Sequence, residues 1–361
     1  MQYCHIFIKN NISSQKWKLY FKESRFLIGG MATIIKEISH EKQRNSCVGM
    51  QASSFCRAQA ILFKSRKKHG LLYSIATVAG LFCIPGILSV MSSETEIQPL
   101  IQRILAPPLI TAMIAVGMYI LNDLVDAEAD KANSKNRPIP SGLVSRKQAW
   151  SFIIMTNGAA IGIAIAALNL ASIILVVPMI VIGILYSVPK IALMNRFVLK
   201  NMAIASFYML CTMLGITSNY GIDEAINNPT VPIHTMAISG VMIFVGSIVN
   251  DLGDTKGDKQ AGRRTIPIVI GGENTIRMLV ILLLIMPTIS WMLHAKSVGQ
   301  ETVTLWASIA VTGVALLALL RIAKIRKVFE DMHLMREQHK KWFPLYIVLQ
   351  VSFVAAALLA L

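Results

Sequence analysis

Residues 122–130 read Asn-Asp-Leu-Val-Asp-Ala-Glu-Ala-Asp, and residues 250–258 read Asn-Asp-Leu-Gly-Asp-Thr-Lys-Gly-Asp. Both stretches follow the pattern N-D-x-x-D-x-x-x-D, so they form an internal repeat. Each copy comes at the end of a long apolar stretch, residues 100–121 for the first and residues 234–250 for the second. The repeat predicts that both acidic motifs lie where an apolar helix ends and that they serve one site.

The composition of the chain is that of a membrane protein. Of its 361 residues, 54% are hydrophobic and only 15% are charged, whereas globular proteins average about 25% charged residues. These values exclude a disordered chain and argue against an ordinary water-soluble domain. The formal net charge of +16 comes with no groove-reading motif, so basic loops beside a membrane explain it better than nucleic-acid binding. We therefore expect membrane lipids among the partners and no nucleic acid.

Apolar stretches long enough to cross a membrane recur along the chain. A spanning helix needs about 20 predominantly apolar residues. The sequence therefore predicts an all-α integral membrane protein with nine transmembrane helices, at residues 71–91, 100–121, 150–168, 170–187, 198–217, 234–250, 275–294, 303–320 and 342–361.

Lys and Arg gather in alternate loops between these predicted spans. The loop after the second span, for example, carries Lys131, Lys135 and Arg137, whereas the loop after the first carries Glu94 and Glu96. Basic loops stay on the cytoplasmic side of a membrane. Nine spans with a cytoplasmic N-terminus place every basic loop and both acidic motifs on that side. We therefore predict a multi-pass protein of the cell membrane whose site faces the cytoplasm.

Residues 1–69 differ from the rest of the chain. They are rich in Lys, Arg, Ser and Gln, contain only the acids Glu23, Glu37 and Glu41, and include no apolar run long enough to span. Two interpretations stay open, a basic cytosolic tail and an organelle-targeting extension, and the abundance of Lys over Arg favours the tail. The predicted domains are this N-terminal tail, residues 1–69, and a nine-helix domain, residues 70–361.

The spacing of the acids in the first motif places them on one helix face. Asp123, Asp126 and Asp130 stand at i, i+3 and i+7. Three carboxylates so close repel one another unless cations neutralise them. Carboxylate oxygens suit Mg²⁺, and the Lys and Arg residues that follow each motif suit oxyanions, so the pattern predicts a Mg²⁺-diphosphate site. The alternative class is a membrane cation transporter, since transporters also carry internal repeats and intramembrane acids.

Further elements accompany the two motifs. They are Arg137-Pro-Ile-Pro-Ser-Gly142, Tyr186-x-x-x-Lys190, and Gly262 followed by Thr265-Ile-Pro267. Together with the acidic motifs they resemble the UbiA superfamily of intramembrane prenyltransferases over most of residues 70–361. The resemblance implies nine helices, a Mg²⁺ cofactor and a polyprenyl diphosphate donor. It also implies a reaction in which the allylic C–O bond ionises and a nucleophilic acceptor captures the cation.

The resemblance implies roles for individual residues by matching positions. The expected metal ligands are Asn122, Asp123, Asp126, Asp130, Asp254 and Asp258. The expected substrate-binding residues are Asn122, Arg137, Lys131, Lys259, Arg263 and Arg264. The residues expected to act in catalysis are Asp126, Asp254, Lys190 and Tyr186.

The short spacing between Asp130 and Arg137 bears on the acceptor. It is similar to the branch of the superfamily that makes archaeal ether lipids, which implies transfer of a geranylgeranyl group to the hydroxyl of geranylgeranylglyceryl phosphate. The spacing also resembles members that prenylate aromatic acceptors in quinone, tocopherol or chlorophyll synthesis. A lipid acceptor is therefore expected, and an aromatic acceptor is the alternative.

Overall fold

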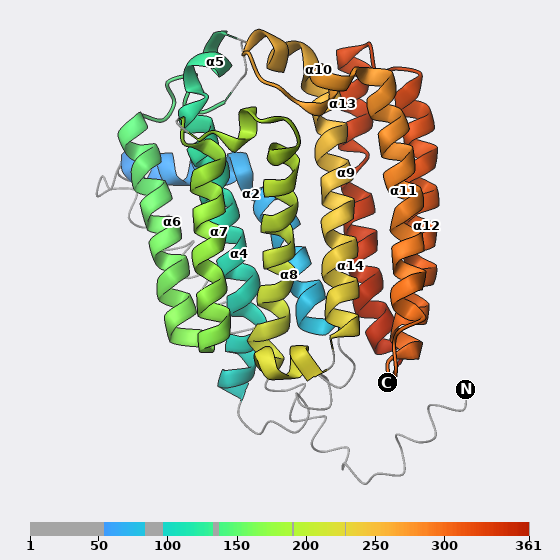
Figure 1. Cartoon of the computed structure of the whole chain (residues 1–361). Coiled ribbons are helices and arrows are strands. Elements are labelled where there is room, and N and C mark those ends of the chain that lie inside the picture. The colour runs from blue at the N-terminus through green and yellow to red at the C-terminus, as the bar shows by residue number, and fades with distance from the viewer. Residues whose placement is uncertain (1–53, 84–96, 133–136, 190, 228, 361) are drawn as a thin grey trace, which may run out of the picture. The chain divides into compact units, whose positions relative to one another are not determined.

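The computed structural model describes residues 54–83, 97–132, 137–189, 191–227 and 229–360 (Figure 1). The chain divides into two compact units, residues 1–57 and 58–361. Except for residues 54–57, which form the first turn of helix α2 (Ser54–Phe82), all the described residues belong to the second unit. Every regular element in the described ranges is helical, which confirms the predicted all-α class. The predicted domain boundary between residues 69 and 70 stays a prediction. One helix, α2, runs through this position.

Long helices form the body of the second unit (Figure 1). Besides α2 they are α4 (Ile97–Val125), α6 (Arg146–Ala167), α7 (Leu170–Ser187), α8 (Phe197–Asn227), α9 (Thr230–Gln260), α11 (Gly272–His294), α12 (Glu301–Arg326) and α14 (Phe343–Leu358). Shorter helices lie together at one end of the bundle, namely α5 (Ala127–Ala132), α10 (Ile266–Ile270) and α13 (Met332–Lys340) (Figure 1). A 3₁₀ turn, η2 (Leu193–Asn195), precedes α8.

Eight helices in the described ranges are long and apolar enough to cross a membrane, and they coincide with the second to ninth predicted spans. The structural helices are longer than the predicted stretches at several ends, because polar residues continue the helices past the apolar core. The first predicted span, residues 71–91, lies partly outside the described residues, and α2 covers its first half. The count of nine spans and the cytoplasmic N-terminus therefore stay predictions.

The outer surface of the bundle is apolar. Ile154 on α6 is 68% exposed, Ile165 on the same helix is 65% exposed, and Leu170 at the start of α7 is 72% exposed. Large aliphatic side chains in such numbers on a surface indicate contact with hydrocarbon rather than with water. The surface and the eight helices identify a multi-pass membrane protein.

The two acidic motifs end different helices in different ways. The second motif lies wholly within α9, whereas α4 ends at Val125 and α5 begins at Ala127. The backbone of the first motif keeps helical bonds across this break, since the amide of Asp126 donates to the carbonyl of Asn122 at 2.9 Å and that of Asp130 to Asp126 at 2.8 Å. The predicted common face is therefore largely preserved.

Glycines hold α2 and α8 at very close approach. A Cβ atom added at Gly80 would lie 2.0 Å from the carbonyl oxygen of Thr212, and one added at Gly215 would lie 2.1 Å from that of Thr77. Each glycine thus packs against the backbone one turn from the other, an arrangement typical of small-residue contacts between membrane helices. The contact fixes α2, and with it the position of Arg66.

We expect Gly80→Ala to destabilise the protein, because the new methyl group overlaps a backbone oxygen that cannot move aside. The loss should lie at the upper end of about 1–3 kcal/mol and appear as a lower melting temperature of the purified protein in detergent. Gly158→Ala on α6 is the matched control, since a Cβ there has no atom within 4 Å. Equal melting temperatures for the two variants would contradict the close approach.

Candidate active site

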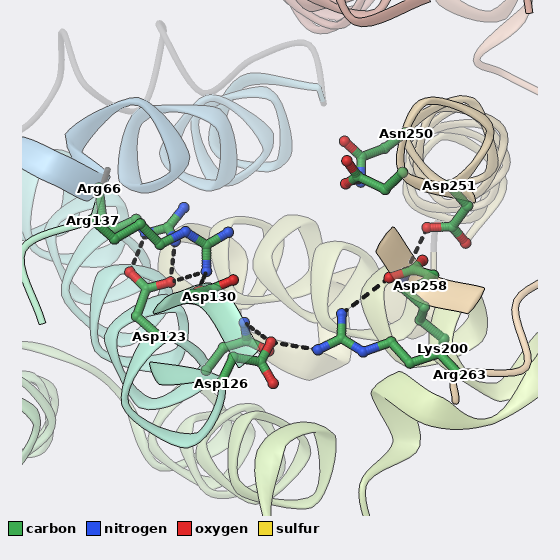
Figure 2. Close-up of polar contacts among 12 residues, drawn as sticks. Arg66, Asp123, Asp126, Asp130, Arg137, Lys200, Asn250, Asp251, Asp258 and Arg263 are labelled. Carbon is green, nitrogen blue, oxygen red and sulfur yellow. Dashed lines mark hydrogen bonds and ion pairs between the residues drawn. The ribbon is translucent and has the colours of Figure 1, made fainter. Parts of the chain in front are cut away.

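The three aspartates of the first motif are buried and lie among arginines. Arg66 of α2 donates to Asp123 through two nitrogens, with its Nε 2.7 Å from Oδ2. Arg137 donates through Nη1 to Asp123 Oδ1 at 2.7 Å and also contacts Asp130 (Figure 2). One guanidinium therefore joins two carboxylates of the predicted face, as the i and i+7 spacing requires.

Arg263 connects the two motifs. Its Nη2 lies 2.6 Å from Asp126 Oδ2 of the first motif, and its Nη1 lies 3.2 Å from Asp258 Oδ1 of the second (Figure 2). Burial opposes the charge of Arg263, but the two carboxylates outweigh this effect and raise the pKa of its guanidinium. Through Arg263 the structure brings the two copies of the repeat together at one end of the bundle.

A buried ion pair supports the second motif. Lys200 Nζ of α8 lies 2.5 Å from Asp251 Oδ1 and 3.7 Å from Asp258 Oδ2. Asn201 Nδ2 donates to the other oxygen of Asp251 at 3.1 Å. Both partners of the pair are almost fully buried, so each charge depends on the other.

The two motifs repeat one local contact. Asn122 Nδ2 donates to Asp126 Oδ2 at 3.3 Å, and Asn250 Nδ2 donates to Asp254 Oδ2 at 3.4 Å. The same i to i+4 geometry on two helices orients the middle carboxylate of each motif. The repeat is therefore structural as well as sequential.

The other predicted site residues differ in their surroundings. Tyr186 is half-buried at the end of α7, where the charges of Lys200 and Arg263 act on its hydroxyl. The side chains of three predicted oxyanion binders are exposed to solvent, namely Lys131, Lys259 and Arg264. Lys190 lies outside the described residues.

Sequence reasoning did not assign roles to Arg66 and Lys200. Both belong to the basic residues near the ends of apolar stretches, and nothing in the local sequence distinguishes Arg66 from its neighbours. For Lys200 a signal was present in its position inside the apolar stretch 198–217, where a charged side chain must find a buried partner. Arg66 could be found only by knowing that α2 lies beside α4.

The site has the chemistry to hold a divalent cation with an anionic ligand. The two motifs contain seven carboxylates, and Asp258 Oδ2 is buried without a hydrogen bond. In the described ranges, no three His, Cys, Asp or Glu residues lie together in metal-binding geometry. Basic side chains lie between the acids instead, as Arg263 does between Asp126 and Asp258. The donor set nevertheless fits Mg²⁺, which binds through a few carboxylates together with phosphate oxygens.

We expect Lys200→Met to destabilise the protein strongly, because it leaves the carboxylate of Asp251 buried without its cation. The loss should be about 3–5 kcal/mol, measured as the melting temperature in detergent. The double variant Lys200→Met with Asp251→Asn should recover much of it, since the second change removes the orphaned charge. A double variant no more stable than Lys200→Met alone would contradict this account of the pair.

Comparison with known proteins agrees with the fold and the motifs. Residues 79–358 match the family described as the UbiA prenyltransferase family. This match covers most of the chain, so the protein belongs to the UbiA prenyltransferase family, as the motifs indicated.

Two relatives with sequence similarity are archaeal digeranylgeranylglyceryl phosphate synthases. The chain is 28% identical over 202 residues to a digeranylgeranylglyceryl phosphate synthase of Methanoculleus marisnigri, a match that covers 55% of this chain and 66% of that protein. It is 29% identical over 176 residues to the digeranylgeranylglyceryl phosphate synthase of Sulfolobus acidocaldarius, covering 47% of this chain and 58% of that protein. The matches thus span less than two thirds of these relatives.

Solved structures share the fold at low sequence identity. A UbiA homologue from Archaeoglobus fulgidus, bound to GPP and Mg²⁺, superimposes with a TM-score of 0.60 at 17% identity, over 84% of this chain and 100% of that one. The apo structure of a UbiA homologue from Aeropyrum pernix gives a TM-score of 0.57 at 15% identity, over 82% and 98% of the two chains. At such identities the likeness shows the fold alone.

Proposed function

We propose that this protein transfers a geranylgeranyl group from its allylic diphosphate to the free hydroxyl of geranylgeranylglyceryl phosphate, forming an ether lipid. The observation that carries the proposal is the Arg263 bridge between Asp126 and Asp258, which makes one site of two motifs. Membership of the family supports prenyl transfer, and the archaeal relatives support the lipid acceptor over an aromatic one.

Mg²⁺ is the proposed cofactor. Asn122, Asp123, Asp126, Asp130, Asp254 and Asp258 would hold it together with the donor's diphosphate. When bound, Mg²⁺ would supply Lewis-acid stabilisation of the negative charge that gathers on the departing diphosphate.

The basic side chains of the site have a second proposed task. Three arginines form ion pairs with carboxylates of the site, namely Arg66, Arg137 and Arg263. When an anionic donor binds, their guanidinium groups can turn from carboxylate to diphosphate oxygens, which they bind with the same planar fork. Once turned to the diphosphate, these hydrogen-bond donors would stabilise the negative charge of the leaving group.

The apolar bundle would surround the isoprenoid chain of the donor. The isoprenoid chain of the donor enters hydrocarbon-like surroundings, and the allylic cation forms where water is scarce, so capture by water is suppressed. Tyr186, on whose hydroxyl the charges of Lys200 and Arg263 act, would orient the diphosphate at this boundary. We propose the cell membrane as the location, with the site on the cytoplasmic side.

The test uses membranes from cells that express the full chain, with labelled geranylgeranyl diphosphate. Geranylgeranylglyceryl phosphate and an aromatic acceptor are offered separately, each with and without EDTA. We expect an ether product that EDTA abolishes and excess Mg²⁺ restores. Transfer to the aromatic acceptor alone would overturn the lipid assignment. The absence of any prenyl product, with ion-dependent flux instead, would overturn the enzyme in favour of a transporter.

A further inference from the structure

A polar layer lies one helical turn deeper in the bundle than the acidic cluster. Tyr119 stands at i−4 from Asp123 on α4, so it shares the face of the first motif and lies about 6 Å further from the end of the helix. The imidazole of His69 packs on this ring with centroids 4.1 Å apart. Arg66 lies over the same ring, 5.6 Å from its centroid.

His69 has an unused polar atom in this layer. By distance and angle its buried Nδ1 has no hydrogen-bond partner, although the backbone of Arg66 lies near enough to raise the pKa of the imidazole. Tyr119, its neighbour, already pairs its hydroxyl with that of Tyr73 at 3.3 Å. A buried ring nitrogen without a partner costs free energy unless a ligand supplies one. His69 therefore offers a binding position for a group that the chain does not provide.

The depth of this layer matches the reacting carbon of the proposed donor. A diphosphate held by the carboxylate cluster directs its isoprenoid chain into the bundle, so the first carbon lies just beneath the cluster. The nucleophile must approach that carbon from the same level. On α2, Arg66 and His69 stand at i and i+3 and share one face, so a side chain at the diphosphate level and one at the carbon level come from the same helix.

We propose that His69 binds the hydroxyl of the acceptor and receives its proton during ether formation. This inference rests on the proposed function. In the step, the C–O bond to diphosphate breaks and its electron pair leaves with the diphosphate. The acceptor oxygen then forms the new C–O bond, and its proton moves to His69, which passes it to the departing diphosphate.

The electrostatic surroundings of His69 suit such a role. Burial, together with the neighbouring charges of Arg66, Arg137 and His339, lowers the pKa of His69 to about 3, so the resting imidazole is neutral and one nitrogen can accept a hydrogen bond. The negative charge of a bound diphosphate offsets the two arginines and raises the proton affinity of His69. An alcohol oxygen that has just bonded to a carbocation is strongly acidic, so a weak base suffices.

The experiment follows both fates of the labelled donor in His69→Ala. Ether product, prenyl alcohol and diphosphate are measured in membranes that contain equal amounts of folded protein. We expect ether formation to fall about 100-fold or more, whereas diphosphate release continues with prenyl alcohol as its product. Added imidazole should restore part of the transfer. His333→Ala, at an exposed position on α13, is the control and should match the wild type.

A second variant guards against a folding defect. His69→Gln keeps a hydrogen-bond acceptor but cannot take the proton, so we expect a KM for the acceptor near that of the wild type and a lowered kcat. Unchanged transfer in both variants, or a parallel loss of transfer and diphosphate release, would overturn the role of His69. No ether product from the wild type would overturn the proposed function itself, and the inference with it.

Discussion

Asp126→Asn should lower prenyl transfer at least about 100-fold, the scale of losing one electrostatic contact to a reacting group. Asp126 is the carboxylate that Arg263 and Asn122 both contact, so it orders the first motif and faces the second. An asparagine keeps the size of the side chain but removes the negative charge that a divalent cation needs. Ether product per amount of folded protein, at saturating donor and acceptor, is the measurement.

The matched control for this change lies two residues away. Glu128→Gln removes an acid from the same motif, but Glu128 is exposed to solvent and should leave turnover within about twofold of wild type. Raising the Mg²⁺ concentration should rescue Asp126→Asn in part, because weakened cation binding is the expected cause. If Asp126→Asn turns over as fast as Glu128→Gln, the first motif does not hold the cofactor.

Arg263→Leu should produce the second large loss, again about 100-fold or more in kcat. This residue joins the two motifs and is the cation that touches both Asp126 and Asp258 (Figure 2). Arg263→Lys should recover only a fraction, since an ammonium group cannot present two parallel donors to separate oxygens as a guanidinium does. Steady-state rates at varied donor concentration separate a binding defect from a catalytic one.

Lys256→Gln provides the comparison for Arg263. Lys256 is an exposed basic residue within the second motif, so it tests whether positive charge near the acids is sufficient. We expect it to retain wild-type rates at moderate salt. Equal losses in Lys256→Gln and Arg263→Leu would mean that general attraction of anions, rather than the bridge, accounts for the effect.

Hydropathy and repetition predicted most of the fold. Eight of the predicted spans coincide with structural helices because each is apolar over a length that only a membrane helix needs. Helix ends were less predictable. The two motifs have the same sequence pattern, so the sequence did not reveal that α9 continues unbroken through Asp254 to Gln260 whereas the chain bends at Asp126 in the first motif. In both motifs the backbone stays helical, so the spacing of the acids alone gave their shared face.

The partners of the acids were less predictable than the acids themselves. Arg137 and Arg263 follow the motifs in sequence and were expected at the site, but Lys259 and Arg264 have the same local context and point to solvent. Arg66 and Lys200 come from helices whose neighbours are set by packing. Composition places basic residues near the membrane, and only the arrangement of α2 and α8 determines which of them meet a carboxylate.

The glycine contact between α2 and α8 has a consequence for biosynthesis. The ribosome adds about 5–20 residues per second, and more than a hundred residues separate Gly80 from Gly215. The face of α2 that carries Gly80 therefore remains without its packing partner, α8, for on the order of ten seconds. Assembly of this protein thus depends on a nascent helix that is held unpaired, by lipid or by the insertion machinery, until α8 arrives.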